Sequence, residues 1–113
     1  MNKEILVIDD NPDLRFLICK ILKEESYEIR SAANYDQAEK EIKKKLPDLA
    51  IIDIKLDKSD KDGIDLLKLI MSIEPTTPVI MISGHATVQI AVEAIRLGAY
   101  EFIEKGTTFS TDK

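Results

Sequence analysis

Polar side chains that could do chemistry stand at the ends of several short apolar runs in this 113-residue chain. They are Asp9 and Asp10, Asp53, Ser83, and Lys105. Carboxylates that lie within a few ångströms repel one another, and a hard divalent cation relieves that repulsion through its oxygen ligands. If the fold brings the three aspartates together, the sequence therefore predicts a Mg²⁺ site.

Asp53 also has the chemistry of a nucleophile. A carboxylate can attack phosphorus and form an aspartyl phosphate, whose charge must then be neutralised. Lys105 could supply the positive charge and Ser83 a hydroxyl donor. Taken singly, each residue has an ordinary structural explanation, because aspartates cap helices and turns, and lysines are commonly solvated. Their joint position after apolar runs is what favours a site.

The apolar runs themselves predict the strands of a sheet. Short, uniformly apolar segments suit strands buried on both faces of a parallel sheet, and an alternating segment suits an edge strand. The predicted strands are residues 5–8, 27–31, 49–52, 78–82 and 100–103. Apolar side chains at three- and four-residue spacing predict helices at residues 12–25, 34–45, around 66–70, and at 86–97.

Strands that alternate with helices indicate an α/β fold with a doubly wound parallel sheet. Right-handed crossover connections leave few other topologies. In such sheets ligands bind at the carboxyl ends of the strands, near the point where the strand order reverses. We therefore expect the five polar residues to meet at one edge of the sheet.

Composition narrows the class of protein. Apolar residues make up 44% of the chain, and 16 basic against 21 acidic residues give a formal charge of −5. This balance fits one globular domain without the basic surface of a nucleic-acid binder. Cys19 has no disulfide partner, and neither a membrane-spanning segment nor a signal peptide is recognisable. We expect a cytoplasmic domain.

Four segments together resemble the receiver domains of two-component response regulators. They are residues 7–11 (VIDDN), 51–54 (IIDI), 82–86 (ISGHA) and 98–105 (GAYEFIEK). The likeness covers residues 3–105. The run from Ser83 to Lys105 is most similar to regulators of the NtrC/NtrX nitrogen type.

The resemblance implies a fold and roles for particular residues. The fold would be flavodoxin-like, with five parallel strands in the order 2-1-3-4-5. Asp53 would be the phosphoacceptor. The ligands of Mg²⁺ would be Asp9, Asp10, Asp53 and the carbonyl group of Lys55. The phosphoryl-binding and switch residues would be Ser83, Lys105 and Phe102.

The resemblance also implies a function in signalling. A sensor histidine kinase would phosphorylate the domain, which is a regulatory phosphoprotein rather than an enzyme. Phosphorylation would change a partner or homodimer surface on the fourth helix and fifth strand, and so control transcription. Residues 1–113 would form one receiver domain, an N-terminal fragment of a longer regulator with ATPase and DNA-binding domains. No direct nucleic-acid binding by this domain is expected.

The sequence departs from the family pattern in three places. Gly106 follows Lys105 where the family usually has a proline with a cis peptide bond, and the loop between Asp53 and Gly63 is about two residues longer than usual. The fifth helix is expected to be missing or truncated, which would expose apolar surface for self-association. These departures keep open a receiver-like interaction module that works without phosphorylation. A phosphohydrolase is a weaker alternative, because Lys55 stands where such enzymes carry a second acid.

Overall fold

Five parallel strands form one sheet in the computed structural model, which describes residues 3–56, 61–85 and 87–105. The strands are β1 (Glu4–Ile8), β2 (Glu28–Ala32), β3 (Leu49–Asp53), β4 (Val79–Ser83) and β5 (Glu101–Glu104). The helices are α1 (Pro12–Glu24), α2 (Tyr35–Lys44), α3 (Gly63–Ile73) and α4 (Val88–Arg96). The strand order is β2-β1-β3-β4-β5, which confirms the predicted flavodoxin-like topology.

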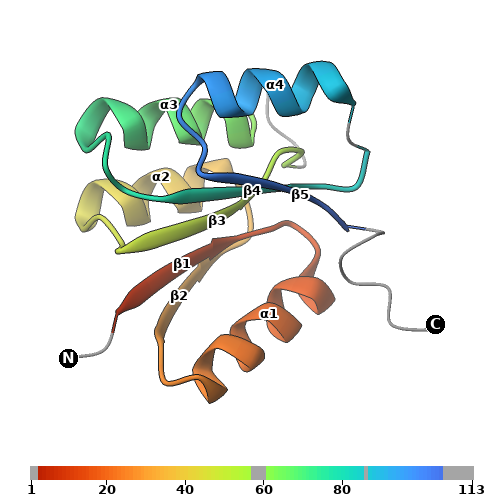
Figure 1. Ribbon diagram of the computed structural model, residues 1–113. Helices are drawn as coiled ribbons and strands as arrows, with labels where there is room; N and C mark the ends of the chain where they lie inside the picture. Colours follow the sequence, from red (N-terminus) through yellow and green to blue (C-terminus); the bar gives the residue numbers. More distant parts are fainter. Residues whose placement is uncertain (1–2, 57–60, 86, 106–113) are drawn as a thin grey trace.

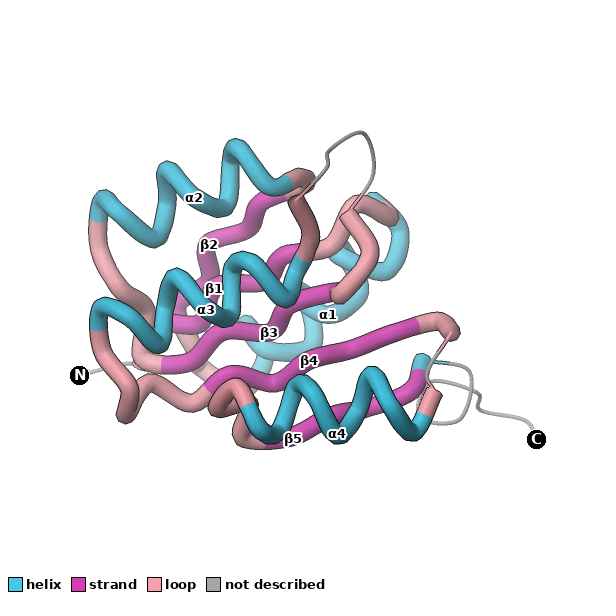
Figure 2. Tube along the Cα trace, turned by 90° about the horizontal axis from the view of Figure 1, so that it is seen from above, coloured by secondary structure: helices cyan, strands magenta, loops and turns pink. Residues whose placement is uncertain are grey.

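The helices cover both faces of the sheet. Figure 1 shows α2, α3 and α4 on one face and α1 on the other, and in Figure 2 α1 lies behind the sheet. The apolar runs of β1, β3 and β4 are buried between these layers, whereas β2 and β5 form the two edges. This burial explains why the three central strands are uniformly apolar and the edge strands are not.

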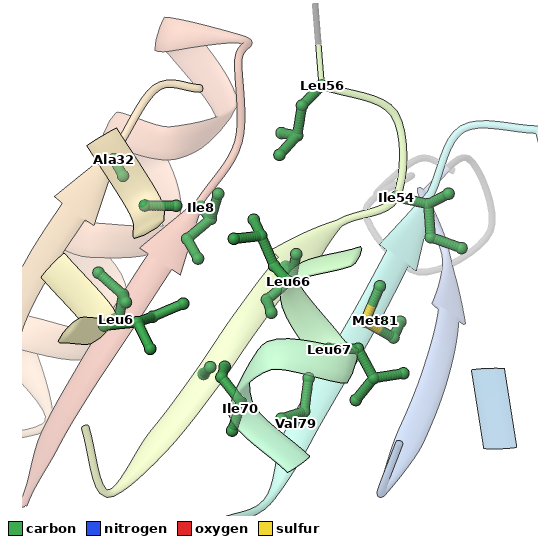
Figure 3. Packing of buried hydrophobic residues seen from close by; sticks show 14 of the residues in the cluster. Leu6, Ile8, Ala32, Ile54, Leu56, Leu66, Leu67, Ile70, Val79 and Met81 are labelled. Carbon is green, nitrogen blue, oxygen red and sulfur yellow. The ribbon is translucent and has the colours of Figure 1, made fainter. Parts of the chain in front are cut away.

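Most of the core lies between the sheet and the layer of α2, α3 and α4. Leu66, Leu67 and Ile70 of α3 are fully buried against Leu6 of β1 and Val79 of β4 (Figure 3). A smaller cluster on the opposite face packs α1 against the sheet. Because the strands are held from both sides, the positions of their carboxyl ends are fixed relative to one another.

Side-chain caps set where the helices begin. Asn11 accepts hydrogen bonds from the backbone N–H groups at the start of α1, and Asn34 does the same for α2. Asp62 caps α3 through a capping box. Thr87 caps α4, so this helix begins at Val88 rather than near Ala86, because the threonine hydroxyl accepts from the N–H of Ile90.

The described part of the chain contains four helices, in agreement with the prediction that the fifth is missing or truncated. Residues 106–113, which include Gly106 and its peptide bond, lie outside the described residues, as do residues 57–60 of the long loop. The predictions about the peptide bond before Gly106 and about the long loop therefore stay predictions. Among the described residues, no helix has both the length and the apolar character needed to cross a bilayer.

Candidate functional site

The carboxyl ends of adjacent strands bring the predicted polar residues to one edge of the sheet. Asp9 follows β1 directly, and Asp53 and Ser83 are the last residues of β3 and β4. Lys105 follows β5. Since β1, β3, β4 and β5 are consecutive neighbours in the sheet, residues up to about a hundred positions apart in the chain converge there.

Three aspartates form an acidic cluster at this edge. Asp9, Asp10 and Asp53 each have a carboxylate oxygen within 4.8 Å of those of the other two. Asp9 and Asp53 are buried, with 0% and 3% of their surface exposed, and Asp10 is half-buried. The cluster could bind a metal ion, because buried carboxylates at this separation repel one another unless positive charge lies between or beside them.

Lys105 supplies one such charge. Its Nζ donates a hydrogen bond to Oδ2 of Asp53 at 2.9 Å and lies 3.2 Å from Oδ2 of Asp9. The ammonium group therefore joins the strands β1 and β3 to the end of β5. Burial alone would lower the pKa of Lys105, but the carboxylates of Asp53 and Asp9 outweigh it and raise that pKa above its ordinary value.

Asp53 is the carboxylate with the most perturbed environment. Burial raises the pKa of Asp53 from its ordinary value of 3.8 to about 6. The hydrogen bond from Lys105 opposes this change, and the charges of Asp9 and Asp10 add to it. A carboxyl group whose pKa lies near neutral pH needs little free energy to ionise at that pH. The ionised carboxylate is the nucleophilic form.

Asp9 shows how a cation would fit. Its Oδ1 accepts a hydrogen bond from the backbone N–H of Asn11 at 2.9 Å. Its Oδ2 is buried and has no hydrogen-bond partner among the described residues, although the ammonium of Lys105 lies 3.2 Å away. A carboxylate oxygen has more than one lone pair, so this oxygen could bind a cation beside its ion pair with Lys105. The oxygen donors of the cluster suit a hard divalent cation, so these residues fit Mg²⁺.

The remaining predicted residues lie around the cluster. Ser83 is buried, and its hydroxyl oxygen accepts a hydrogen bond from the N–H of His85 at 3.2 Å. The N–H of Lys55 donates to Oδ1 of Asp53 at 3.3 Å, so this residue adjoins the acceptor. Phe102 is half-buried on β5 and packs against the larger core cluster. The functional roles assigned to these residues stay predictions.

Two supporting residues were not predicted from the sequence. A Cβ at Gly63 would lie 2.2 Å from the carbonyl oxygen of Asp53, so only glycine lets the start of α3 approach the acceptor backbone. Its N–H donates to the carbonyl of Ile54 at 2.7 Å. Arg15 donates from Nη1 to the carbonyl oxygen of Asp9 at 2.6 Å. A glycine at a helix start could have suggested the first contact, whereas nothing local marks the second.

The fold and the site together define a receiver domain. The sequence model described as the response regulator receiver domain matches residues 5–111. The chain belongs to this family, as its resemblance predicted, and the family is one of response regulators rather than of catalytic enzymes.

Among its relatives, the chain is similar to the nitrogen assimilation regulatory protein NtrX. It is 44% identical to NtrX of Azorhizobium caulinodans over 113 residues, which are 100% of this chain and 24% of that protein. The chain thus spans about a quarter of the length of this relative. It is also 33% identical over 106 residues to the chemotaxis protein CheY of Thermotoga maritima, covering 93% of this chain and 87% of that protein.

Solved structures of NtrX proteins are also similar to this chain. The crystal structure of NtrX from Brucella abortus is 47% identical with a TM-score of 0.84, over 93% of this chain and 23% of that one. The crystal structure of the receiver domain of NtrX from Brucella abortus is 48% identical with a TM-score of 0.82, over 89% of this chain and 84% of that one. The predicted likeness to the NtrC/NtrX type is confirmed.

Proposed function

We propose that this domain is a phosphorylation-dependent signalling switch that accepts a phosphoryl group on Asp53 from a sensor histidine kinase. One observation carries the proposal: the buried Asp53 carboxylate lies within 4.8 Å of two other carboxylates and 2.9 Å from the ammonium of Lys105. Anionic and cationic groups at this spacing suit the binding of both a divalent cation and a phosphoryl group.

In the proposed reaction, a carboxylate oxygen of Asp53 attacks the phosphorus of a phosphohistidine on the kinase. A P–O bond forms as the P–N bond breaks, and the leaving imidazole keeps the electron pair and takes a proton from solvent. Asp9, Asp10, Asp53 and the carbonyl of Lys55 would hold Mg²⁺, which supplies positive charge to the phosphoryl oxygens when bound. Lys105 would form an ion pair with those oxygens, and the hydroxyl of Ser83 would donate to them.

The same residues would couple phosphorylation to a change of surface. Lys105 contacts both Asp53 and Asp9, so new negative charge on Asp53 changes the balance of its ion pairs. Ser83 and Phe102 lie on the neighbouring strands β4 and β5 and would rearrange together. On the elements next along the chain, Val88 at the start of α4 is 80% exposed, and Tyr100, which directly precedes β5, is 73% exposed. We propose this α4–β5 surface as the contact with a second copy of the domain.

The wider setting follows from the NtrX relatives, whose length is about four times that of this chain. In a protein of that kind, the receiver domain would control ATPase and DNA-binding domains and thereby transcription. The −5 charge of the domain is consistent with protein partners rather than direct contact with nucleic acid. We place this signalling in the cytoplasm, where the kinase domain of a sensor would meet it.

The test is phosphorylation by a small-molecule phosphodonor followed by intact-protein mass spectrometry. With Mg²⁺ we expect the mass of one phosphoryl group, about 80 Da, and we expect no adduct after Asp53→Asn. Asp36→Asn is the matched control, because Asp36 is an exposed carboxylate in the first turn of α2. An unmodified wild-type protein, or an adduct that persists in Asp53→Asn, would contradict the proposal.

A further inference from the structure

Arg15 connects α1 to the backbone that carries the acidic cluster. This half-buried side chain lies in the first turns of α1, and its guanidinium Nη1 donates to the carbonyl oxygen of Asp9 at 2.6 Å. Hydrogen bonds from a charged donor are shorter and stronger than those between neutral groups. The contact therefore fixes the backbone of a buried carboxylate from outside the acidic cluster.

The other contacts of Asp9 explain why this bond matters. Its N–H donates to the carbonyl of Ala32 on β2 at 3.2 Å, and its Oδ1 accepts from the N–H of Asn11 at 2.9 Å. The N–H of Arg15 itself donates to the carbonyl of Asn11 at 3.0 Å. Arg15 thus holds both ends of the short segment from Asp9 to Asn11, and this segment contains two of the three clustered carboxylates.

Position and charge predict opposite effects of Arg15 on cation binding. A guanidinium near an acidic cluster repels a divalent cation, so the charge alone weakens binding. A fixed carboxylate is ready to bind without an ordering cost, so the hydrogen bond strengthens binding. Since the carbonyl contact is short and fixes the backbone of Asp9, whose carboxylate belongs to the acidic cluster, the positioning effect acts directly on a residue of the cluster.

We infer that Arg15 is a positioning residue for the divalent-cation site: through the carbonyl group of Asp9, it holds the Asp9 carboxylate where it can share a cation with Asp10 and Asp53. The inference rests on the proposed function in requiring that the acidic cluster bind Mg²⁺. It adds a residue outside the cluster whose removal changes the affinity for the cation.

The experiment is isothermal titration calorimetry of the unphosphorylated protein with Mg²⁺. Groups that orient metal ligands commonly contribute tenfold or more to affinity, so we expect Arg15→Met to raise the Kd about tenfold. Arg15→Lys keeps a donor that can reach the same carbonyl and should recover most of the affinity. Lys20→Met, which removes an exposed charge from the same helix, should leave the Kd unchanged or slightly lower.

The direction in which the Kd for Mg²⁺ changes tests the role of Arg15. An unchanged or lower Kd in Arg15→Met, or no recovery in Arg15→Lys, overturns the role of Arg15. Urea denaturation in EDTA shows that each variant is folded before titration. If Arg15→Met does not fold, Arg15→Gln replaces it, because the shorter neutral amide also removes the charge and the contact. A wild-type protein that binds no Mg²⁺ would instead overturn the cation site itself.

Discussion

Replacement of Asp53 by asparagine should make the metal-free domain more stable. Asparagine has nearly the same shape as aspartate but carries no charge, so it removes a buried anion from beside Asp9 and Asp10 while its oxygen can still accept from Lys105. The energetic cost of keeping Asp53 ionised is visible in its pKa, which burial raises from 3.8 to about 6. Functional carboxylates are commonly kept in such unfavourable environments.

The magnitude and the sign follow from proton linkage. Between pH 3.8 and about 6 the folded protein holds a proton on Asp53 that the unfolded chain releases, so stability falls as the pH rises through this window. At ~1.4 kcal/mol for each unit of pKa shift, keeping Asp53 ionised lowers the free energy of unfolding by about 3 kcal/mol above pH 6. The free energy of unfolding of Asp53→Asn should therefore match that of the wild type near pH 4 and exceed it by about 2–3 kcal/mol at pH 7.5.

The assay is urea denaturation followed by circular dichroism from pH 4 to pH 8 in EDTA. The difference between the two proteins cancels the titration of carboxylates that lie far from Asp53. The exposed Asp36→Asn variant should show no such pH-dependent difference. Adding Mg²⁺ should stabilise the wild type more than the variant, because a ligand stabilises the state that binds it. A pH-independent difference, or a wild type more stable at pH 7.5, would refute the reasoning.

Three further substitutions, two at the site and one at the opposite end of the sheet, are tested by urea denaturation. Lys105→Met should destabilise the wild type at pH 7 by about 2 kcal/mol, because it leaves buried carboxylates unpaired; a loss of the same size in the Asp53→Asn background would contradict that cause. Gly63→Ala should destabilise the protein by about 2 kcal/mol or more, because its Cβ would lie 2.2 Å from the carbonyl oxygen of Asp53. Gly84→Ala is the control and should have little effect, because a Cβ there would lie 4.0 Å from its nearest neighbour, Cδ of Lys105. Arg30→Met should cost about 2 kcal/mol, because its guanidinium donates to two carboxylates and to the backbone at the end of α2; a loss below about 0.5 kcal/mol would show that these bonds contribute little.

The class of fold, and the edge of the sheet where the site lies, could both be predicted from the pattern of residues. Uniformly apolar runs such as residues 5–8 identify central parallel strands, because only strands covered on both faces can lack polar residues. Ligands of such sheets bind at the carboxyl ends of strands, so Asp9 and Asp53 could be assigned to one edge without coordinates. Caps such as Asn11 and Asn34 were also predictable, because capping is a local interaction.

The contacts between these residues could not be predicted from the sequence. The ion pairs of Lys105 with Asp53 and Asp9, the close approach of Gly63 to the acceptor, and the bond from Arg15 to Asp9 join residues on different elements. Such contacts depend on how the helices pack against the sheet and on side-chain conformation, which a periodic pattern does not encode. The raised pKa of Asp53 has the same origin, because burial and neighbouring charge are properties of the packed site rather than of any single segment.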